Sequence, residues 1–347
     1  MTVTIDLNKK NDLSYDIHIG ELPIINIVEN RKVAIITNPK VAGLHLATLL
    51  AKLPKCDLHI ITIPDGEQYK NMESVDTILE SLFNHKFNRK SILISLGGGV
   101  IGDITGFSAS LYQRGIDFIQ IPTTLLAQVD ASVGGKTGVN NKFGKNLIGA
   151  FHQPKAVFIN PEFLLTLPQR EISAGFAELL KVAVIFDKIF FEYLETQEKN
   201  SNIEYVIQKS VELKAEIVSQ DEKEKGVRAS LNYGHTFGHI VENETDYSKY
   251  LHGEAVAIGM VMANELALEL GIMNGDEVSR VKNVLKLAGL PITYKIKDID
   301  GFYQKFFLDK KSTDTNIKFI VPNGIGAFEF KDELSEETLK KVLRKFQ

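Results

Sequence analysis

Short runs of strand-forming apolar residues recur through the first half of the chain, and amphipathic helical patterns lie between them. Between the second and third runs, residues 72–83 place Met72, Val75 and Ile78 at helical spacing. Strands that alternate with helices predict βαβ units and a parallel sheet. Their nearly continuous apolar character is typical of strands covered on both faces. The runs are residues 33–37, 58–63, 91–96 and 118–122.

The pattern changes after residue 160, where long helical periodicities dominate. A brief strand signal returns at 317–322 and 327–330, joined by an N-G turn signal. We therefore expect an α/β domain over residues 1–160 and a mainly α-helical domain over residues 161–347. The helical periodicities cover residues 170–186, 203–219, 253–270, 276–287 and 333–346.

Composition excludes several classes of protein. The chain has 347 residues, of which 44% are hydrophobic, and a formal charge of −4, so nothing favours a nucleic-acid partner. Its one cysteine, Cys56, excludes an internal disulfide and a thiolate metal site. The N-terminus lacks a signal-peptide pattern, and no apolar run is long enough to span a bilayer. We expect a soluble, cytoplasmic protein without a membrane partner.

Glycines follow the run at 91–96. Gly97, Gly99 and Gly102 satisfy the G-x-G-x-x-G pattern at the start of a helical segment. Glycines there let the backbone approach a pyrophosphate, whose charge then lies at a helix N-terminus. A tight, close-packed turn would use the same glycines. Because the pattern lies on the third βα unit, we expect a Rossmann-like nucleotide-binding domain of atypical topology.

Asp65–Lys70 follows the run at 58–63. At the carboxyl end of a neighbouring strand, its carboxylate and ammonium could hold a ribose and a pyrophosphate. Taken alone, the segment is an ordinary polar loop.

Residues 121–151 form a long connection that is dense in glycine. Long structured loops after strands are usually functional, and lysines beside glycine turns suit an anionic substrate or a cofactor phosphate. The alternative is a solvated surface loop, but the small apolar residues between the charges argue against full exposure. The polar residues in question are Asp130, Lys136, Lys145 and Asn146.

Three of the chain's 8 histidines, His235, His239 and His252, lie in one short region. His235 and His239 are four residues apart, so on a helix both imidazoles project from one face. Such a pair with a third ligand makes a metal site that keeps an open position. A pair of capping or core histidines beside a glycine turn is the alternative.

The A-E-L-L-K segment at 177–181 lies in a strongly apolar helical pattern. Glu178 and Lys181 are three residues apart and share a face, which indicates either an exposed stripe or a site. A carboxylate plus two histidines is a recognised open zinc set. Lys214 and Arg228 add two basic positions before the histidines.

These motifs together resemble the 3-dehydroquinate synthase family. The resemblance runs from about Asn38 to Gly324, in order and with appropriate spacing. The matching segments are G-G-G-V-I-G-D, P-T-T-L-L-A-Q-V-D, G-G-K-T-G-V-N, G-K-N-L-I-G-A-F, A-E-L-L-K, N-Y-G-H-T-F-G-H and H-G-E-A-V-A.

The resemblance implies a nucleotide-binding α/β domain and a mainly helical metal- and substrate-binding domain, in a homodimer. It implies conversion of 3-deoxy-D-arabino-heptulosonate 7-phosphate to 3-dehydroquinate and phosphate, in the shikimate pathway of aromatic amino acid biosynthesis. NAD would transiently oxidise the C5 hydroxyl and later return the hydride. Phosphate elimination would fall between these events, and an aldol closure would follow. A substrate with a carboxylate and a phosphate explains the many candidate Lys and Arg residues.

The resemblance also implies residue roles. Glu178, His235 and His252 would bind zinc, or cobalt, so His239 would face the substrate. Arg114 would reach the phosphate in the partner subunit's site. Substrate positions are Arg114, Asp130, Lys136, Asn146, Lys181, Lys214, Arg228, Asn232 and His239; Lys181, Lys214, Arg228, Asn232 and His239 would act in catalysis. NAD positions are Asn38, Asp65, Glu67, Lys70, Gly98, Gly99, Val100, Ile101, Gly102, Asp103, Thr123, Thr124, Lys136, Lys145, Phe163, Leu164, Leu165 and Thr166.

The chain departs from the family pattern at one visible position. The family usually carries Asp where this chain has Asn38. An amide still hydrogen-bonds a ribose hydroxyl but carries no charge, so we expect somewhat altered NAD affinity. The D-K-K at 309–311 resembles a C-terminal lysine motif without deciding between Lys310 and Lys311.

Three other functions compete with this interpretation. A metal-dependent alcohol or glycerol dehydrogenase would leave Lys181, Lys214 and Arg228 without a purpose, and it would accumulate NADH. Another sugar phosphate cyclase would keep the metal ligands but alter the substrate residues, which here look intact. A non-catalytic binding module is the weakest alternative.

Overall fold

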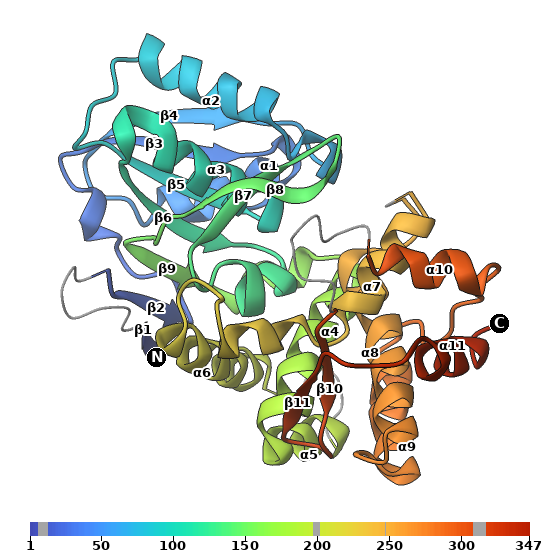
Figure 1. Cartoon of the computed structure of the whole chain (residues 1–347). Helices are drawn as coiled ribbons and strands as arrows, with labels where there is room; N and C mark the ends of the chain where they lie inside the picture. The colour runs from blue at the N-terminus through green and yellow to red at the C-terminus, as the bar shows by residue number, and fades with distance from the viewer. Residues whose placement is uncertain (6–12, 197–201, 247, 308–316) are drawn as a thin grey trace. The chain divides into compact units, whose positions relative to one another are not determined.

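A computed structural model describes residues 1–5, 13–196, 202–246, 248–307 and 317–347 (Figure 1). It divides into two compact units. Unit 1 comprises Met1–Pro168 with Ile203–Lys223, and unit 2 comprises Gln169–Asn202 with Glu224–Gln347. The predicted domains, 1–160 and 161–347, differ from these units mainly at α6 (Ile203–Gln220). This helix packs against β1 (Thr2–Ile5) and the π-helical turn Ala127–Ala131, because its apolar face is buried by unit 1.

Unit 1 is built on a seven-stranded sheet with the order β1-β2-β9-β6-β5-β3-β4. All neighbouring strands run parallel except β1 and β2. The four predicted strand runs form β3, β4, β5 and β6, which confirms the α/β prediction for this part of the chain. The bounds are β2 (Tyr15–Ile19), β3 (Lys32–Thr37), β4 (Asp57–Thr62), β5 (Ile92–Gly97), β6 (Asp117–Pro122) and β9 (Ala156–Ile159).

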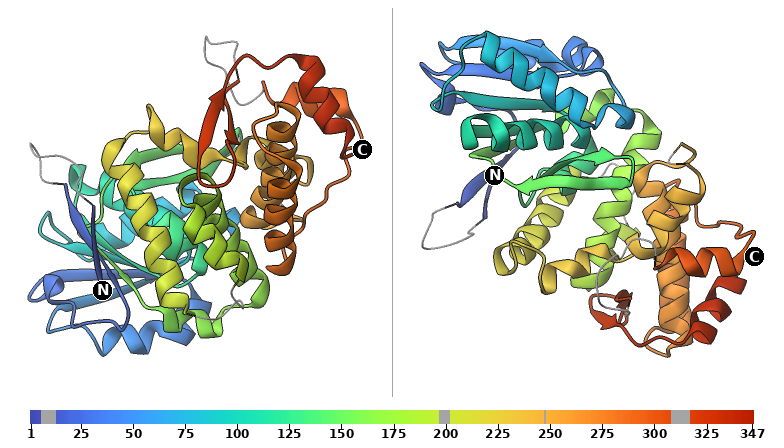
Figure 2. Two further views of the ribbon diagram at one scale, coloured as in Figure 1. Left: turned by 90° about the horizontal axis from the view of Figure 1, so that it is seen from below. Right: turned by 45° about the horizontal axis from the view of Figure 1, so that its top comes forward.

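Both faces of this sheet are covered, as the apolar strands predict. Along β3, Ala34 and Ile36 pack into a core with α2 (Met72–Asn84) and α3 (Gly99–Leu111). The alternate residues Val33 and Ile35 pack into a second core with Leu49 of α1 (Pro39–Leu50). Figure 2 shows the helices of unit 1 on the two sides of the strands.

The long connection after β6 is more regular than predicted. It contains the π-helical turn Ala127–Ala131 and a two-stranded antiparallel sheet of β7 (Lys136–Asn141) and β8 (Gly144–Phe151). Gly138 and Gly149 face each other there, and a Cβ on either would meet backbone atoms of the opposite strand. The glycines therefore serve close strand pairing, and β7 packs against α3.

Unit 2 is mainly helical, as predicted. Its central helix, α8 (His252–Glu269), packs against α4, α7, α9 and α11 (Figures 1 and 2). Most residues of α8 are buried, which matches its lack of a polar face. The other bounds are α4 (Gln169–Phe186), α5 (Lys188–Thr196), α7 (His235–Glu244), α9 (Gly275–Leu287), α10 (Ile299–Lys305), β10 (Phe319–Pro322), β11 (Phe328–Lys331) and α11 (Glu336–Arg344).

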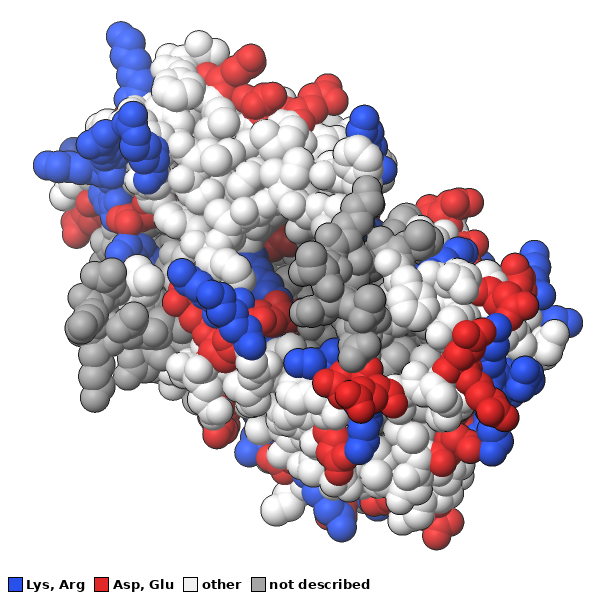
Figure 3. All heavy atoms as spheres, viewed as in Figure 1, with Lys and Arg blue, Asp and Glu red and all other residues white. Residues whose placement is uncertain are grey.

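Within the described residues, no helix combines the length and apolar character needed to cross a membrane. The face drawn in Figure 3 carries Lys, Arg, Asp and Glu side chains, with a group of Lys and Arg at the upper left of unit 1. The two signs are mixed over unit 2.

Candidate active site

Three potential metal ligands converge in unit 2. Glu178 lies on α4, His235 is the first residue of α7, and His252 is the first residue of α8. The Oε1 atom of Glu178 lies 3.6 Å from Nε2 of His235 and 3.8 Å from Nε2 of His252. One ligand atom from each residue lies within 4.8 Å of the others. The arrangement suits a single ion bound by one carboxylate and two imidazoles.

Close helix packing places these ligands. Gly253 follows His252, and a Cβ on it would overlap the backbone carbonyl of Ala174 on α4. Gly234 precedes His235 with a positive φ of 80°, and a Cβ there would crowd Met260 of α8. The glycines therefore let α4 and α7 approach α8 closely enough for their side chains to meet.

Glu254 fixes the start of α8. Its Oε2 accepts a hydrogen bond of 2.8 Å from the backbone N–H of Leu251. Arg170, at the start of α4, donates to both oxygens of the same carboxylate at 2.7 and 2.6 Å. The H-G-E segment thus supplies a potential metal ligand, His252, a close helix contact at Gly253, and a hydrogen-bonded helix start at Glu254.

Charge is balanced at the buried carboxylate. Glu178 is 1% exposed and Lys181 is 2% exposed, and Lys181 Nζ lies 2.5 Å from Glu178 Oε2. Among the described residues, Oε1 of Glu178 receives no hydrogen bond. One oxygen is therefore paired with a cation, and the other is directed at the two imidazoles.

The histidine rings have defined orientations. His235 Nδ1 lies 3.1 Å from the backbone carbonyl of Tyr233, and His252 Nδ1 lies 3.5 Å from Oε1 of Glu242. Burial, followed by the positive charge of Lys181, lowers the pKa of His235 well below its usual value. A neutral ring with its proton on Nδ1 leaves Nε2 as a metal ligand.

His239 lies beside these three residues but does not belong to the Glu178 group. The centroid of its ring lies 5.4 Å from the ring centroid of His235 and 6.1 Å from that of His252. The His239 residue is exposed. A second potential group joins His239, Glu242 and His252. Sequence reasoning missed Glu242, although its place two helical turns after His235 puts it on the same face of α7.

Most predicted NAD residues lie at one edge of the unit 1 sheet. β9, β6, β5, β3 and β4 are parallel neighbours, so their carboxyl ends share this edge. The predicted residues follow these ends in turn. They are Phe163–Thr166 after β9, Thr123 and Thr124 after β6, Gly98–Asp103 after β5, Asn38 after β3, and Asp65, Glu67 and Lys70 after β4.

Gly98 is the N-cap of α3 and offers no side-chain cap to the helix. A Cβ at Gly98 would lie 3.0 Å from Cγ2 of Thr124, and one at Gly99 would lie 3.3 Å from Cβ of Ala131. The backbone N–H groups at the start of α3 therefore have no side-chain cap. A side chain at Gly98 or Gly99 would come close to Thr124 or Ala131, so glycine keeps this approach open. This is the geometry in which a phosphate binds to a helix N-terminus.

Polar pairs connect several of the predicted residues of unit 1. Lys70 Nζ lies 2.5 Å from Asp103 Oδ2 and 2.6 Å from Asn146 Oδ1. Lys214 Nζ donates to the backbone carbonyl and the Oδ1 of Asp130, at 2.6 and 2.7 Å. Lys70 and Lys214 are both buried. These partners offset part of the desolvation cost of burying an ammonium group.

Asn38 has a specific partner. Its side chain accepts from the N–H of Val41 at 2.8 Å, as the N-cap of α1, and donates to Asp65 Oδ1 at 3.0 Å. An Asp at position 38 would place two carboxylates against each other. The amide therefore suits its neighbour in this chain.

The remaining predicted residues lie elsewhere in the two units. Arg228 is buried in unit 2, in the 3-10 segment Val227–Asn232, and Asn232 donates to Glu224 at 2.8 Å. Arg114 is exposed with a positive φ of 70°. Lys136 and Lys145 belong to β7 and β8. Lys310 and Lys311 lie outside the described residues.

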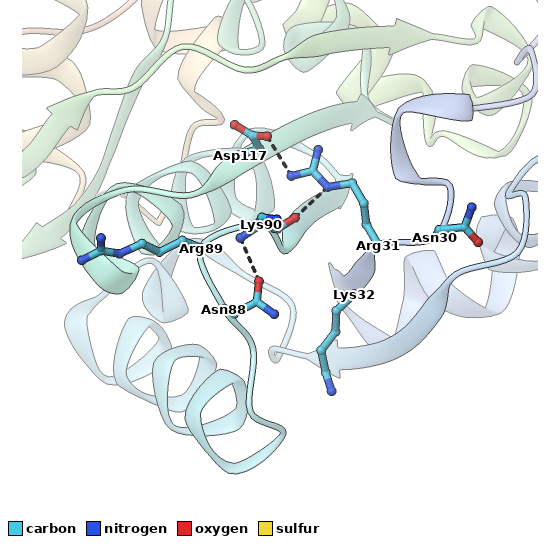
Figure 4. A pocket seen from close by; sticks show the side chains of 7 residues that line it. All are labelled: Asn30, Arg31, Lys32, Asn88, Arg89, Lys90 and Asp117. Carbon is cyan, nitrogen blue, oxygen red and sulfur yellow. Dashed lines mark hydrogen bonds and ion pairs between the residues drawn. The ribbon is translucent and has the colours of Figure 1, made fainter.

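A shallow pocket lies at the opposite edge of the unit 1 sheet (Figure 4). Arg31 precedes β3 and bonds both Asp117 Oδ2, at 2.8 Å, and the backbone carbonyl of Lys90, at 2.7 Å. These residues come from the amino ends of the strands, so the pocket does not belong to the predicted nucleotide edge. Its lining is Asn30, Arg31, Lys32, Asn88, Arg89, Lys90 and Asp117.

Two family models match most of the chain. A model of the 3-dehydroquinate synthase N-terminal region matches residues 60–174, and a model of its C-terminal region matches residues 175–312. The 3-dehydroquinate synthase of Sulfurovum sp. (strain NBC37-1) is 61% identical over 349 residues, covering 100% of this chain and 99% of that protein.

Solved structures agree in fold. A 2-epi-5-epi-valiolone synthase from Streptomyces hygroscopicus subsp. jinggangensis 5008, with NAD⁺ and Zn²⁺ bound, aligns with a TM-score of 0.87 and 28% identity over 98% of both chains. A 2-deoxy-scyllo-inosose synthase with carbaglucose-6-phosphate, NAD⁺ and Co²⁺ aligns at 0.85 with 25% identity over 100% of both chains. A probable glycerol dehydrogenase from Sinorhizobium meliloti 1021 aligns at 0.62 with only 14% identity, over 95% of this chain and 96% of that chain, which shows a shared fold alone.

Proposed function

Because this chain belongs to the 3-dehydroquinate synthase family, we propose that Glu178, His235 and His252 bind its catalytic metal and that the glycine turn after β5 binds NAD. The family and its activity agree with the prediction from the motifs, since curated relatives are named 3-dehydroquinate synthase. That activity converts 3-deoxy-D-arabino-heptulosonate 7-phosphate to 3-dehydroquinate and phosphate.

The observation that carries the metal proposal is the buried Oε1 of Glu178, which faces two imidazole Nε2 atoms at 3.6 and 3.8 Å. A carboxylate oxygen that is buried without a hydrogen-bond donor is costly unless a cation binds it. Two nitrogens and one oxygen suit zinc, and cobalt accepts the same ligands. When bound, the metal would polarise the hydroxyl that is oxidised, and NAD would accept and return its hydride.

Lys181 has two tasks in this proposal. Its ammonium, 2.5 Å from Glu178 Oε2, holds the carboxylate so that the other oxygen is directed at the histidines. It also adds a positive charge beside the ligands, which favours an oxyanion on the substrate. His239 is exposed next to the same histidines and can exchange a proton with the substrate.

The support for NAD is the uncapped start of α3 and the row of polar groups along one sheet edge. The N–H groups beyond Gly98 can bind a pyrophosphate, and the ammonium group of Lys70, which is paired with Asp103, offers a hydrogen-bond donor in the same unit. Asn38 and Asp65, already hydrogen-bonded to each other, offer polar atoms to a ribose.

The support for an anionic substrate is a set of buried cations. Lys214 is fixed by two bonds to Asp130, so its ammonium is already ordered before a carboxylate or phosphate binds. Arg228 is 1% exposed, and a buried guanidinium is suited to bidentate binding of such groups. Lys136, Asn146 and Asn232 complete the proposed substrate set.

We propose a homodimer in which Arg114 reaches the partner's site. Arg114 and its neighbour Gln113 both have positive φ values, of 70° and 47°. Adjacent left-handed residues other than glycine are strained, and such strain concentrates at functional positions. We also place the activity in the cytoplasm, where a chain with Cys56 as its one cysteine needs no disulfide.

Phosphate release from the heptulosonate phosphate, with NAD and Zn²⁺ supplied, tests the proposal. We expect one phosphate and one 3-dehydroquinate per turnover, loss of activity with a chelator, and recovery on adding Zn²⁺ or Co²⁺. No NADH should accumulate. Accumulation of NADH would favour a dehydrogenase, and turnover only with a different sugar phosphate would favour another cyclase.

A further inference from the structure

We propose that Glu242 is a positioning residue that orients the metal ligand His252. The inference rests on the proposed metal site. Oε1 of Glu242 lies 3.5 Å from Nδ1 of His252, and Glu242 is 1% exposed. The carboxylate therefore lies behind the ring, opposite the Nε2 atom that faces Glu178.

Each of the two proposed ligand histidines has an oxygen atom close to its Nδ1. His235 has the backbone carbonyl of Tyr233 at 3.1 Å from Nδ1, and His252 has the Glu242 carboxylate. An acceptor at Nδ1 selects the tautomer with the proton on that nitrogen and leaves the Nε2 lone pair for the metal. A carboxylate acceptor also makes the imidazole a stronger ligand than a neutral acceptor does.

Glu242 can also be considered as a ligand itself, with His239 and His252. Such a site would use Nδ1 of His252, whereas the Glu178 site uses Nε2. The Glu178 group has a second imidazole, His235, whose Nε2 faces the same carboxylate oxygen, whereas His239 of the other group is exposed. The geometry therefore favours Glu242 as the hydrogen-bond partner of a ligand.

The fold holds Glu242 firmly against His252. Glu242 and His235 lie on the same face of α7, two turns apart, so one helix supplies a ligand and the orienting group of another ligand. Gly238 of α7 lies so close to α8 that a Cβ on it would be 2.9 Å from the carbonyl oxygen of Ala255. This close packing fixes the distance between the carboxylate and the ring.

Metal affinity of the full-length protein tests the proposal, measured for Zn²⁺ and Co²⁺ by equilibrium competition with a chelator. Glu242→Ala should bind one metal with roughly 10–100-fold lower affinity. Glu242→Gln keeps an oxygen acceptor without charge and should fall between Glu242→Ala and wild type. Its Co²⁺ complex should show shifted visible bands, which a change in stability alone would not produce.

Glu244→Gln is the matched control. Glu244 lies on the same helix and bonds Tyr294 and Lys305 instead of a proposed ligand, so its loss should leave metal affinity unchanged. If Glu242→Ala fails to fold, Glu242→Gln and its cobalt spectrum carry the test.

Wild-type affinity and spectrum in the folded Glu242 variants would overturn the inference. Complete loss of metal, as expected for His252→Ala, would also overturn it by making Glu242 a ligand. Failure of the proposed function gives a different result, since wild-type protein would then bind no stoichiometric metal.

Discussion

The proposed metal site of unit 2 depends on three helices that pack closely, whereas the proposed NAD site of unit 1 depends on loops that follow neighbouring strands. Glu178, His235 and His252 come from α4, α7 and α8, and glycines bring these helices together. In unit 1, the parallel sheet alone brings its polar loops to one edge. A small change at a helix contact should therefore affect unit 2 more than a comparable change in a loop affects unit 1.

The largest effect is expected from His252→Ala. The variant removes an Nε2 atom that faces Glu178, so stoichiometric metal and turnover should both be lost. Metal content after dialysis and phosphate release measure the two losses. His85→Ala, an exposed histidine of unit 1, is the control and should retain both. A variant that keeps one tightly bound metal would remove His252 from the ligand set.

Lys181→Met should come next. It leaves Glu178 buried without its cation, which should destabilise the metal-free protein by about 3–5 kcal/mol. Added Zn²⁺ should restore more stability than it adds to wild type, because the metal compensates the same carboxylate. Turnover should be lost while Zn²⁺ and NAD still bind. Denaturant unfolding with and without Zn²⁺ measures the stability, and normal phosphate release would refute the role of Lys181.

Gly253→Ala probes the helix contact itself. The added Cβ meets the Ala174 backbone, so α4 and α8 must separate, at a cost of about 1–3 kcal/mol. Metal affinity should fall as well, because Glu178 and His252 move apart. Gly275→Ala on α9 is the matched control, since a Cβ there meets no atom within 4 Å. Equal metal affinity in the two variants would show that close helix packing does not set the ligand geometry.

Asn38→Asp should have the smallest effect. It replaces the hydrogen bond to Asp65 with two facing carboxylates, and the loss is expected to be about 0.5–1.5 kcal/mol. Metal affinity should not change, while NAD affinity should. The double variant Asn38→Asp with Asp65→Asn restores an amide–carboxylate pair and should recover stability. If the double variant is no more stable than Asn38→Asp, the pair has no specific role.

The sequence predicts the sheet edge of unit 1 well, because strand runs and parallel topology together determine where loops such as Asp65–Lys70 and Gly98–Asp103 lie. It does not predict that α6 packs on unit 1, since helical periodicity identifies an apolar face but not its partner. The sequence also does not predict the β7–β8 hairpin, because its glycines look like loop residues until the paired strand is known.

The same limit applies in unit 2. Spacing alone predicts that His235 and His239 share a metal, whereas the family resemblance implies Glu178 and His252 as ligands with His235 in place of His239. The structure brings Glu178, His235 and His252 together, although they are distant in sequence. Glu242 looks like any charged residue of α7 in the sequence, and only its burial beside His252 distinguishes it.

Anomalous diffraction at the zinc edge, from crystals grown with Zn²⁺, tests the central claim most directly. We expect one strong peak bonded to Glu178 Oε1 and to the Nε2 atoms of His235 and His252, with Glu242 at Nδ1 of His252. A peak bonded to His239, Glu242 and Nδ1 of His252, or no ordered peak near Glu178, would contradict the account.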